Sequence, residues 1–296
     1  MKFFKLLGLA NRKHKKKKDI AVIKQDLAIM NHKIDSILRH LYMAGFDELS
    51  APYSLTSQRF KMVSQNEEDG IVLALFKRIG VTDRRFIEIG CGSNGGNSGF
   101  LAQECGWKGL MVDRTEANIE TIKARFAGHD VVAVKSFVTR ENINELIKKS
   151  GFIGEIDLLS MDIDGNDYWV WDAIDVCSPR VVIMEYNWKF GSEKAMTIAY
   201  DATFDRHRSN VRDYYGASLA ALNTLATRKG YRLVACGQAG VNAFFLRNDV
   251  EPSVFGCSVA KAFRCQDKYD RSDVLAQIRK AGLPLVEIER IAGDVL

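Results

Sequence analysis

Residues 86–113 read FIEIGCGSNGGNSGFLAQECGWKGLMVD, and this stretch decides the fold. The apolar run at its start predicts a short buried strand, which four glycines follow directly: Gly90, Gly92, Gly95 and Gly96. Glycine is needed where the backbone turns sharply and presses against a ligand. A short helix and a second strand come next, and that strand ends at Asp113. An acid about 20 residues after a glycine loop suits the diol of a ribose. The stretch therefore predicts an α/β protein that binds a nucleoside cofactor.

The flanking sequence continues the alternation of strands and helices. Apolar runs predict strands at 131–134, 156–161 and 181–184, and amphipathic segments predict helices at 66–79, 116–126, 141–149 and 219–229. Such alternation indicates a parallel sheet, in which ligands bind at the carboxyl ends of the strands. Two further strands, 231–236 and 243–247, are joined by the short turn GQAGVN. A closing hairpin of this kind is unlike an ordinary dinucleotide-binding fold.

Glu88 makes the glycine loop more specific. E-x-G-x-G followed by an acid resembles motifs I and II of class I S-adenosylmethionine-dependent methyltransferases, and the closing hairpin resembles their reversed seventh strand. Six further strings resemble an FkbM-related group of bacterial sugar and natural-product O-methyltransferases: QNEEDGI, ENINEL, IDLLSMDIDGNDYWVW, PRVVIMEYN, YYGASLAAL and NAFFLR. The resemblance covers about residues 65–247. It implies a Rossmann-like, seven-stranded, mostly parallel sheet with a reversed last strand.

The resemblance also implies which residues hold S-adenosylmethionine. Its methionine end would be lined by Glu88, Gly90 and Gly92. Asp113 would accept hydrogen bonds from both ribose hydroxyls, because an ionised carboxylate accepts from two donors. The adenine would lie beside Ser136 and Phe137, although core packing is an equal interpretation of Phe137.

A second dense polar site is DIDGND at 162–167, directly after a predicted buried strand. Three carboxylates in six residues are costly if they are buried without partners. At the carboxyl end of a strand they would face the ligand crevice. We predict a functional role for Asp162 and Asp164, whereas a turn that caps the next helix explains Asn166 and Asp167 equally well.

The neighbouring predicted strand ends in Glu185 and Asn187, which adjacent parallel strands would bring near Asp162. Oxygen ligands from two strand ends suit Mg²⁺, so these three residues are candidate metal ligands. A sugar hydroxyl is a poor nucleophile, and a base or a metal must lower its proton affinity. Asp162 or Asp164 would act as that base. His207 is a further candidate, in a polar segment at 205–210 that could cover the site.

Composition describes an ordinary soluble chain with a basic tail. The 296 residues are 47% hydrophobic and 27% charged. The six cysteines form no C-x-x-C pair and the five histidines lack zinc-site spacing, which predicts a reducing, cytoplasmic location. Eight of the 42 Lys and Arg residues lie in residues 1–18, which leaves 34 basic against 37 acidic residues elsewhere. The catalytic region is therefore not expected to bind nucleic acid.

The N-terminal region carries two expectations about partners. The basic tail, residues 1–18, would lie peripherally on an anionic membrane surface, with a solvated disordered tail as the alternative. Residues 19–44 predict a coiled-coil helix, and residues 20–41 would form a homo-oligomer, because apolar residues recur at intervals of three and four. That seam consists of Ile20, Ile23, Leu27, Met30, Ile34, Ile37 and Leu41.

We expect the remaining organisation to be a linker at 45–64, a methyltransferase domain at 65–249 and a C-terminal extension at 250–296. The predicted reaction is O-methylation of a hydroxyl of a saccharide or related small molecule, in a cell-surface glycan or natural-product pathway. Two alternatives stay open. One is an NAD(P)-dependent oxidoreductase or epimerase, although a suitably placed Tyr-x-x-x-Lys pair is missing. The other is a non-catalytic oligomeric scaffold with the same fold.

Overall fold

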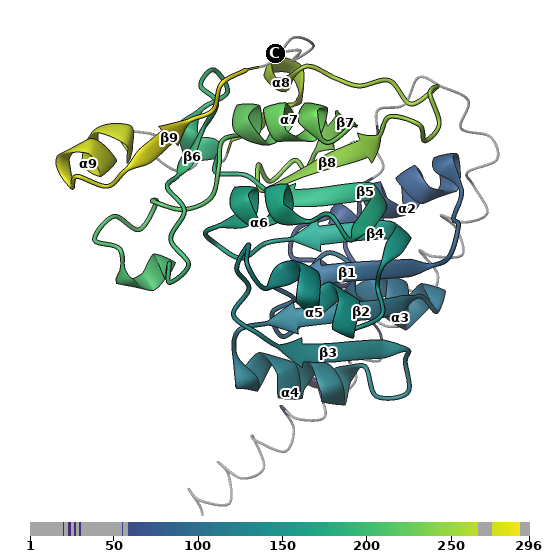
Figure 1. Ribbon diagram of the computed structural model, residues 1–296. Helices are drawn as coiled ribbons and strands as arrows, with labels where there is room; N and C mark the ends of the chain where they lie inside the picture. Colours follow the sequence, from purple (N-terminus) through teal and green to yellow (C-terminus); the bar gives the residue numbers. More distant parts are fainter. Residues whose placement is uncertain are drawn as a thin grey trace, which may run out of the picture. The chain divides into compact units, whose positions relative to one another are not determined.

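Seven strands form one sheet in the order β3-β2-β1-β4-β5-β8-β7 (Figure 1). Five of them run parallel to one another: β1 (Arg85–Ile89), β2 (Lys108–Asp113), β3 (Val131–Lys135), β4 (Gly154–Met161) and β5 (Cys177–Glu185). The hairpin of β7 (Tyr231–Cys236) and β8 (Asn242–Arg247) completes the sheet, with β8 antiparallel to both β5 and β7. The predicted sheet with a reversed last strand is confirmed.

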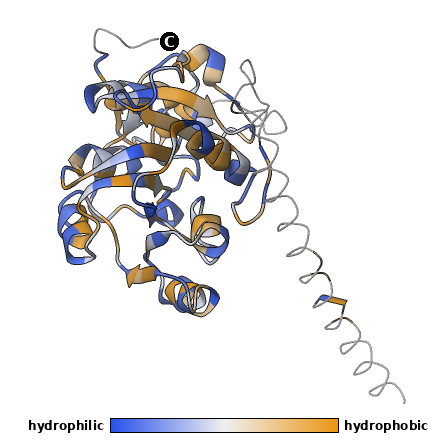
Figure 2. Cartoon of the chain, turned by 90° about the vertical axis from the view of Figure 1, so that its right-hand side faces the viewer, coloured by the Kyte–Doolittle hydropathy of each residue, from blue (hydrophilic) through white to orange (hydrophobic). Residues whose placement is uncertain are grey.

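Helices cover both faces of this sheet. α5 (Ile143–Lys149), α6 (Asp167–Ala173) and α7 (Leu219–Arg228) lie on the near face in Figure 1, and α2 (Glu68–Ile79) and α3 (Gly99–Cys105) lie behind it. α4 (Glu116–Arg125) follows β2 and contacts β2 and β3. The apolar colouring of the strands in Figure 2 agrees with this layering, because strands buried on both faces read as continuous apolar runs.

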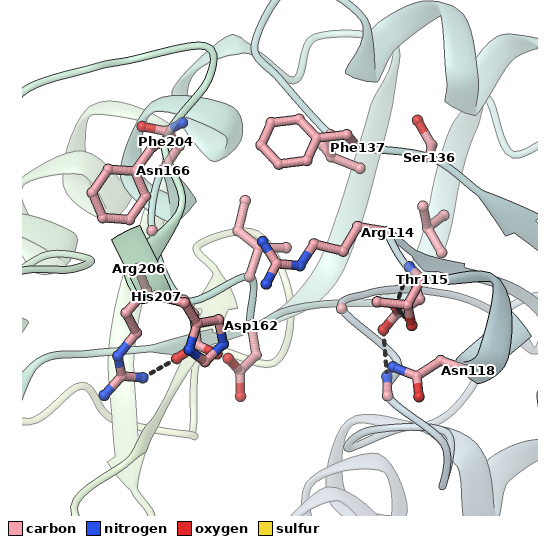
Figure 3. Close-up of a pocket in the computed structure, with 18 residues that line it drawn as sticks. Arg114, Thr115, Asn118, Ser136, Phe137, Asp162, Asn166, Phe204, Arg206 and His207 are labelled. Carbon is pink, nitrogen blue, oxygen red and sulfur yellow. Dashed lines mark hydrogen bonds and ion pairs between the residues drawn. The ribbon is translucent and has the colours of Figure 1, made fainter. Parts of the chain in front are cut away.

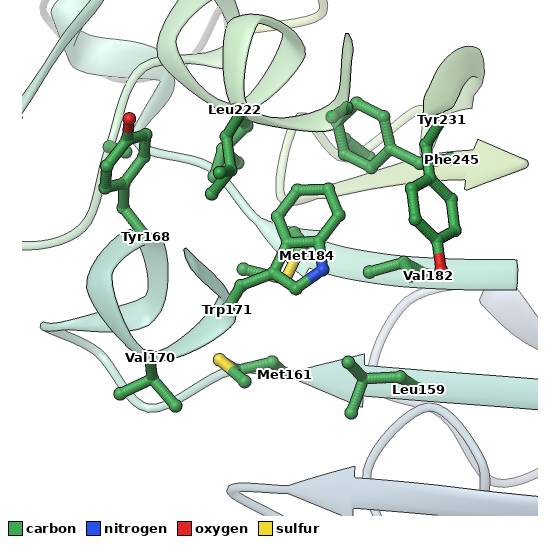
Figure 4. Packing of buried hydrophobic residues seen from close by; sticks show 14 of the residues in the cluster. Leu159, Met161, Tyr168, Val170, Trp171, Val182, Met184, Leu222, Tyr231 and Phe245 are labelled. Carbon is green, nitrogen blue, oxygen red and sulfur yellow. The ribbon is translucent and has the colours of Figure 1, made fainter. Parts of the chain in front are cut away.

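The near-face core is centred on Trp171 of α6, which is fully buried (Figure 4). Its indole lies 5.4 Å from the ring of Phe245 and 6.0 Å from that of Tyr231, both on the closing hairpin. Aromatic pairs at these separations pack favourably edge to face or tilted. The reversed strands are thereby fixed to the helix that follows the acidic segment 162–167.

The C-terminal extension contributes a second, two-stranded sheet that the sequence did not predict. β9 (Leu285–Glu287) pairs antiparallel with β6 (Met196–Ile198), which lies in the segment between β5 and α7. Two short 3₁₀ helices lie in that segment, η3 (Trp188–Phe190) and η4 (Arg206–Arg208), and the extension adds α8 (Val259–Ala262) and α9 (Val274–Lys280). The extension therefore builds part of the region beside the carboxyl ends of the strands.

The segment just before α2 is fixed to the domain. The carboxylate of Asp69 accepts hydrogen bonds from the backbone N–H groups of Met62, Val63 and Ser64. Burial raises the pKa of Asp69 to about 6 despite these bonds. The last residues of the predicted linker are thus ordered by the first turn of α2.

The computed structural model describes residues 59–265 and 274–290, together with Leu55 and a few positions near the N-terminus. The basic tail and most of the predicted coiled-coil helix lie outside the described residues. Four seam positions are described as helical with more than half of each side chain exposed: Ile20, Ile23, Leu27 and Met30. No helix in the described ranges is long and apolar enough to cross a membrane.

Candidate functional site

A cavity of about 340 Å³ opens at the carboxyl ends of β1, β2, β3 and β4 (Figure 3). It collects most of the residues that the sequence singled out. Gly90, Gly92, Asp113, Ser136, Phe137, Asp162, Asp164 and His207 all line it. Predicted residues from four strand ends and one distant segment therefore share one site.

Gly90 allows the loops after β1 and β4 to touch. A Cβ atom built on this residue would lie 1.7 Å from the backbone carbonyl oxygen of Asp162, closer than any side chain permits. The N–H of Asp162 also donates to the carbonyl of Ile89 over 2.9 Å. The glycine requirement at this position thus comes from the close approach of Asp162 to the loop.

Glu88 lies beneath the glycine loop, and it is not among the residues that line the cavity. Its carboxylate accepts hydrogen bonds from the hydroxyls of Ser98 and Ser160, and a Cβ on Gly96 would lie 2.1 Å from its Oε1. Complete burial raises the pKa of Glu88 to about 8, although the hydrogen bonds from Ser98, the Asn97 backbone and Ser160 oppose that rise. Glu88 therefore holds the glycine loop in place and does not face the cavity.

Asp113 is held from both sides at the end of β2. Its Oδ2 accepts from the N–H of Gly92 over 3.0 Å, and its Oδ1 accepts from the N–H and the hydroxyl of Thr115, each over 2.8 Å. An ionised carboxylate offers about four lone-pair positions. Three are used here, which leaves Oδ2 with capacity for one direct hydrogen bond to a ligand.

The other end of the cavity is bounded by Ser136 and Phe137, which follow β3. The Phe137 side chain is 41% exposed, so core packing does not explain it. Its backbone carbonyl accepts from the amide of Asn142, the residue that precedes α5, over 2.8 Å. The ring is thus presented to the cavity by the turn that begins α5.

Three carboxylates meet at the ends of β4 and β5. Oxygens of Asp162, Asp164 and Glu185 lie within 4.8 Å of one another, as the parallel register of the two strands predicted. Burial raises the pKa of Asp162 to about 7, with further contributions from Asp167 and Asp164. Burial and then the charge of Asp162 raise the pKa of Glu185 well above its ordinary value. The Glu185 Oε2 has no hydrogen-bond partner among the described residues.

The remaining polar residues of this region hold its backbone. Asp167 accepts from the N–H groups of Ile163 and Gly165 over 2.8 and 2.9 Å, and burial raises its pKa to about 6. Asn187 donates to the carbonyls of Asp213 and Tyr215, and its Oδ1 accepts from Lys189 N–H. Asp167 therefore holds the turn that precedes α6, and the amide of Asn187 is already engaged.

A segment at 203–209, which we call the strap, closes one side of the cavity. Phe204, Arg206 and His207 line the cavity from it. Asp205 forms an ion pair with Arg114 over 3.2 Å, and Arg206 forms an ion pair with Asp164. The strap is thus attached to the ends of both β2 and β4.

Arg206 lies over an aromatic ring, and its partner Asp164 has an unusual backbone conformation. The Arg206 guanidinium lies 3.7 Å from the centre of the Tyr215 ring. Asp164 has a φ of 55°, a left-handed conformation that aspartate adopts more readily than most residues. The turn after β4 therefore directs one carboxylate towards the strap.

Among the lining residues that sequence reasoning did not single out are Arg114, Thr115, Asn118, Phe204 and Arg206. The first three directly follow the acid at the end of β2, and that position was a usable signal. The two strap residues are brought in by contacts with positions about 40 residues away, Gly165 for Phe204 and Asp164 for Arg206. The polar segment at 205–210 was expected to cover the site, but Arg206 itself was not singled out.

Comparison with known proteins gives one family match and several similar structures. The FkbM methyltransferase domain family matches residues 78–233. A search of curated proteins found no match. Three solved structures with low identity are similar: an O-methyltransferase from Bacillus cereus in complex with SAH (15% identity, TM-score 0.42, covering 71% of this chain and 96% of that one), an S-adenosylmethionine-dependent methyltransferase from Clostridium acetobutylicum (11%, 0.39, 73% and 98%) and a TehB-like methyltransferase from Corynebacterium glutamicum (14%, 0.35, 74% and 98%).

The family match supplies the identification. It begins at the end of α2, runs into β7 and includes the ends of the strands that build the cavity. Because it spans more than half of the 296 residues, the chain belongs to the FkbM methyltransferase domain family and is an S-adenosylmethionine-dependent methyltransferase.

Proposed function

We propose that this methyltransferase methylates a hydroxyl of a saccharide or a related small molecule, in a cell-surface glycan or natural-product pathway. The observation that carries the proposal is the carboxylate cluster of Asp162, Asp164 and Glu185, two of which, Asp162 and Asp164, line the cavity that also contains Asp113. A hydroxyl needs a base or a metal before it attacks, whereas a softer nucleophile such as a thiolate does not need this cluster.

Residues that line the cavity would contact each part of S-adenosylmethionine. We assign one ribose hydroxyl to the free capacity of Asp113 Oδ2 and the other to Asn118, which lines the same wall. Ser136 and the exposed ring of Phe137 would border the adenine. Gly90 and Gly92 would let the methionine end approach the backbone, and Glu88 would support that loop from below.

The chemical step then depends chiefly on orientation and on one proton. When bound, the cofactor supplies an electrophilic methyl group, whose bond to sulfur breaks as its bond to the acceptor oxygen forms. Asp162 accepts the proton of the acceptor hydroxyl, since a base with a pKa of about 7 is half ionised at neutral pH. Asp164 orients the acceptor from the rim, and His207 is the second candidate base.

Magnesium is the alternative way to lower the proton affinity of the hydroxyl. The donor set fits a hard cation, because Asp162, Asp164 and Glu185 offer carboxylate oxygens within 4.8 Å of one another and Glu185 Oε2 lacks a partner. Asn187 contributes less to such a site than its sequence position implied, because its amide is engaged by the backbone. Arg206 would compete with a cation for Asp164.

The N-terminal region adds a proposal about location. Residues 20–41 would join the chain to further copies of itself, and residues 1–18 would hold the assembly peripherally at the cytoplasmic membrane. Support comes from the seven-residue apolar seam and the eight basic residues of the tail. The methyltransferase domain would then act on acceptors made or carried at that surface.

Ligand binding and product analysis test the proposal. Calorimetric titration should show binding of S-adenosylhomocysteine and none of NAD(P). Binding of NAD(P) alone would favour the oxidoreductase, and binding of neither would favour the scaffold. Incubation of radiolabelled S-adenosylmethionine with glycan precursors of the cell should then give a labelled methyl ether. Label on nitrogen, sulfur or carbon would contradict O-methylation.

A further inference from the structure

A second cavity, of about 390 Å³, lies beyond the strap, and the reaction described above does not use it. It is bounded by the segment 199–214 on one side and by Leu283 and Pro284 of the C-terminal extension on the other. Phe204 lines both this groove and the cofactor cavity. Phe204 is therefore the lining residue that the two spaces share.

The cofactor cavity alone is too small for both reactants. Drug-sized ligands occupy pockets of roughly 300–1,000 Å³, and a nucleoside joined to an amino acid is a ligand of that size. The cofactor therefore takes up most of the about 340 Å³ at the strand ends. Space remains there for a reacting hydroxyl beside Asp162, while the rest of the acceptor must lie elsewhere.

The groove beyond the strap has an apolar base. The rings of Phe204 and Tyr214 meet at 5.9 Å, edge to face. The Tyr214 hydroxyl donates to the carbonyl of Pro284 over 2.6 Å, and Ala199 N–H donates to the same oxygen over 3.2 Å. Both walls of the groove are thereby tied together, so the groove is preformed.

Its rim is polar and only partly occupied. Thr203 donates its N–H and its hydroxyl to one carboxylate oxygen of Asp201, each over 2.8 Å, which leaves the other oxygen open. The guanidinium of Arg208 is exposed and makes no hydrogen bond or ion pair with any residue that the structure describes. Acceptors and donors are therefore both available at the rim.

We propose that this groove holds a pyranose ring of the acceptor, one that is not itself methylated. A pyranose has an apolar face of C–H groups and a rim of hydroxyls, which matches an aromatic base surrounded by a carboxylate, a hydroxyl and a guanidinium. The methylated unit extends past Phe204 to Asp162. The acceptor is accordingly larger than a monosaccharide, and the C-terminal extension is part of its binding site. This inference rests on the proposed methylation of a saccharide.

Saturation-transfer NMR with a panel of methyl pyranosides (gluco, manno, galacto and rhamno) tests the groove directly. In the full-length protein saturated with S-adenosylhomocysteine, we expect transfer to the ring protons of at least one pyranoside. Thr203→Trp and Pro284→Trp fill the groove from its two walls, and each should reduce that transfer at least fivefold. Ala202→Trp is the matched control, because Ala202 is exposed in the same segment but does not line the groove.

The outcomes separate this inference from the proposed function. Calorimetry should give the same affinity for S-adenosylhomocysteine in the wild type and the three variants. If the wild type itself does not bind S-adenosylhomocysteine, the cofactor assignment is contradicted and not the pyranose site. Three results would overturn the pyranose site. They are absence of transfer to every pyranoside, stronger transfer to catechol (an aromatic diol, tested beside the panel), and signals that persist in both groove variants. Thermal melting identifies a variant that fails to fold, and the variant on the opposite wall then decides.

Discussion

The backbone N–H of Gly92 donates to Oδ2 of Asp113 over 3.0 Å, so the glycine loop after β1 and the acid at the end of β2 are fixed to each other. Two features that lie about 20 residues apart in the sequence thus form one preorganised unit. Rigid positioning of a binding group lowers the entropic cost of binding.

Replacement of Asp113 by Ala should weaken binding of S-adenosylhomocysteine at least tenfold. It removes an ionised acceptor, worth about 1.5–3 kcal/mol per hydrogen bond, and it also frees Gly92. Isothermal titration calorimetry measures the loss. The control is Asp130→Ala, at an exposed position outside the cavity. Unchanged affinity in the Asp113 variant would remove the ribose assignment.

Asp162→Asn should abolish methyl transfer and leave S-adenosylhomocysteine binding within about threefold of the wild type, because the isosteric amide keeps the backbone contacts of this residue but cannot take a proton. Single-turnover assays with labelled cofactor measure the transfer. EDTA separates the two mechanisms. Activity that EDTA removes and Mg²⁺ restores assigns the carboxylates to a metal, whereas full activity in EDTA removes the metal and leaves the base mechanism.

Glu88 should make the domain less stable as the pH rises. The carboxyl has an ordinary pKa of 4.5 when unfolded and a pKa of about 8 when folded. Between these values the folded state keeps a proton that the unfolded state has lost, so the free energy of unfolding falls by up to about 1.4 kcal/mol per pH unit. The nearest titratable groups are Asp162, whose charge adds to the rise, and Cys91, which burial keeps as a neutral thiol.

Glu88→Gln should therefore flatten the dependence of stability on pH between about 5 and 8. Urea denaturation at pH 5, 6.5 and 8 measures it. Glu120→Gln, on the exposed surface of α4, should keep the slope of the wild type. An equal slope in both variants would mean that Glu88 is ionised in the folded protein.

The strap should control how fast the cofactor leaves. Its two ion pairs, Asp205 with Arg114 and Arg206 with Asp164, are both partly exposed, and such pairs contribute about 0.2–1 kcal/mol each. Asp205→Asn should accelerate dissociation of S-adenosylhomocysteine by about two- to fivefold, and added salt should reduce the difference from the wild type. Surface plasmon resonance measures the rate. Glu116→Gln, which breaks an exposed pair with Lys135, is the control.

The coiled-coil prediction is tested at Ile34, one of the seam positions outside the described residues. Ile34→Glu would bury a charge in the interface at a cost of several kcal/mol, so light scattering should show a smaller species with a folded methyltransferase domain. Deletion of residues 1–18 should keep the oligomer and reduce sedimentation with anionic liposomes, most clearly at low salt. Aggregation of the Ile34 variant would indicate that the helix packs on its own domain.

The sequence predicted the seven-stranded sheet well because each of its strands is five or more residues long and is largely apolar. The run before Glu185 and the turn between β7 and β8 needed no tertiary information. The small sheet escaped prediction because β6 and β9 have three residues each, too few to show a period. Pairing between positions 196–198 and 285–287 is a long-range event.

The site residues also differ in whether local sequence or long-range contacts place them. Acids at strand ends, such as Asp113 and Asp162, could be placed from the sequence because the end of a parallel strand faces the ligand. The burial of Glu88 could not, because it depends on two serines, one in the next helix cap and one in β4. Arg206 was missed for a similar reason, since its partner Asp164 is 42 residues away.

Because β8 lies between β5 and β7, the sheet cannot be completed until the ribosome has released β8. β7 emerges first, but it has no strand to pair with until residues 242–247 follow it. Until then β5 presents an unpaired apolar edge, the kind of surface that pairs with other chains. A fragment that stops at residue 233, where the family match ends, would keep this edge exposed permanently and is expected to aggregate. Formation of the last hairpin therefore covers the edge of β5 and prevents the nascent domain from pairing with other chains.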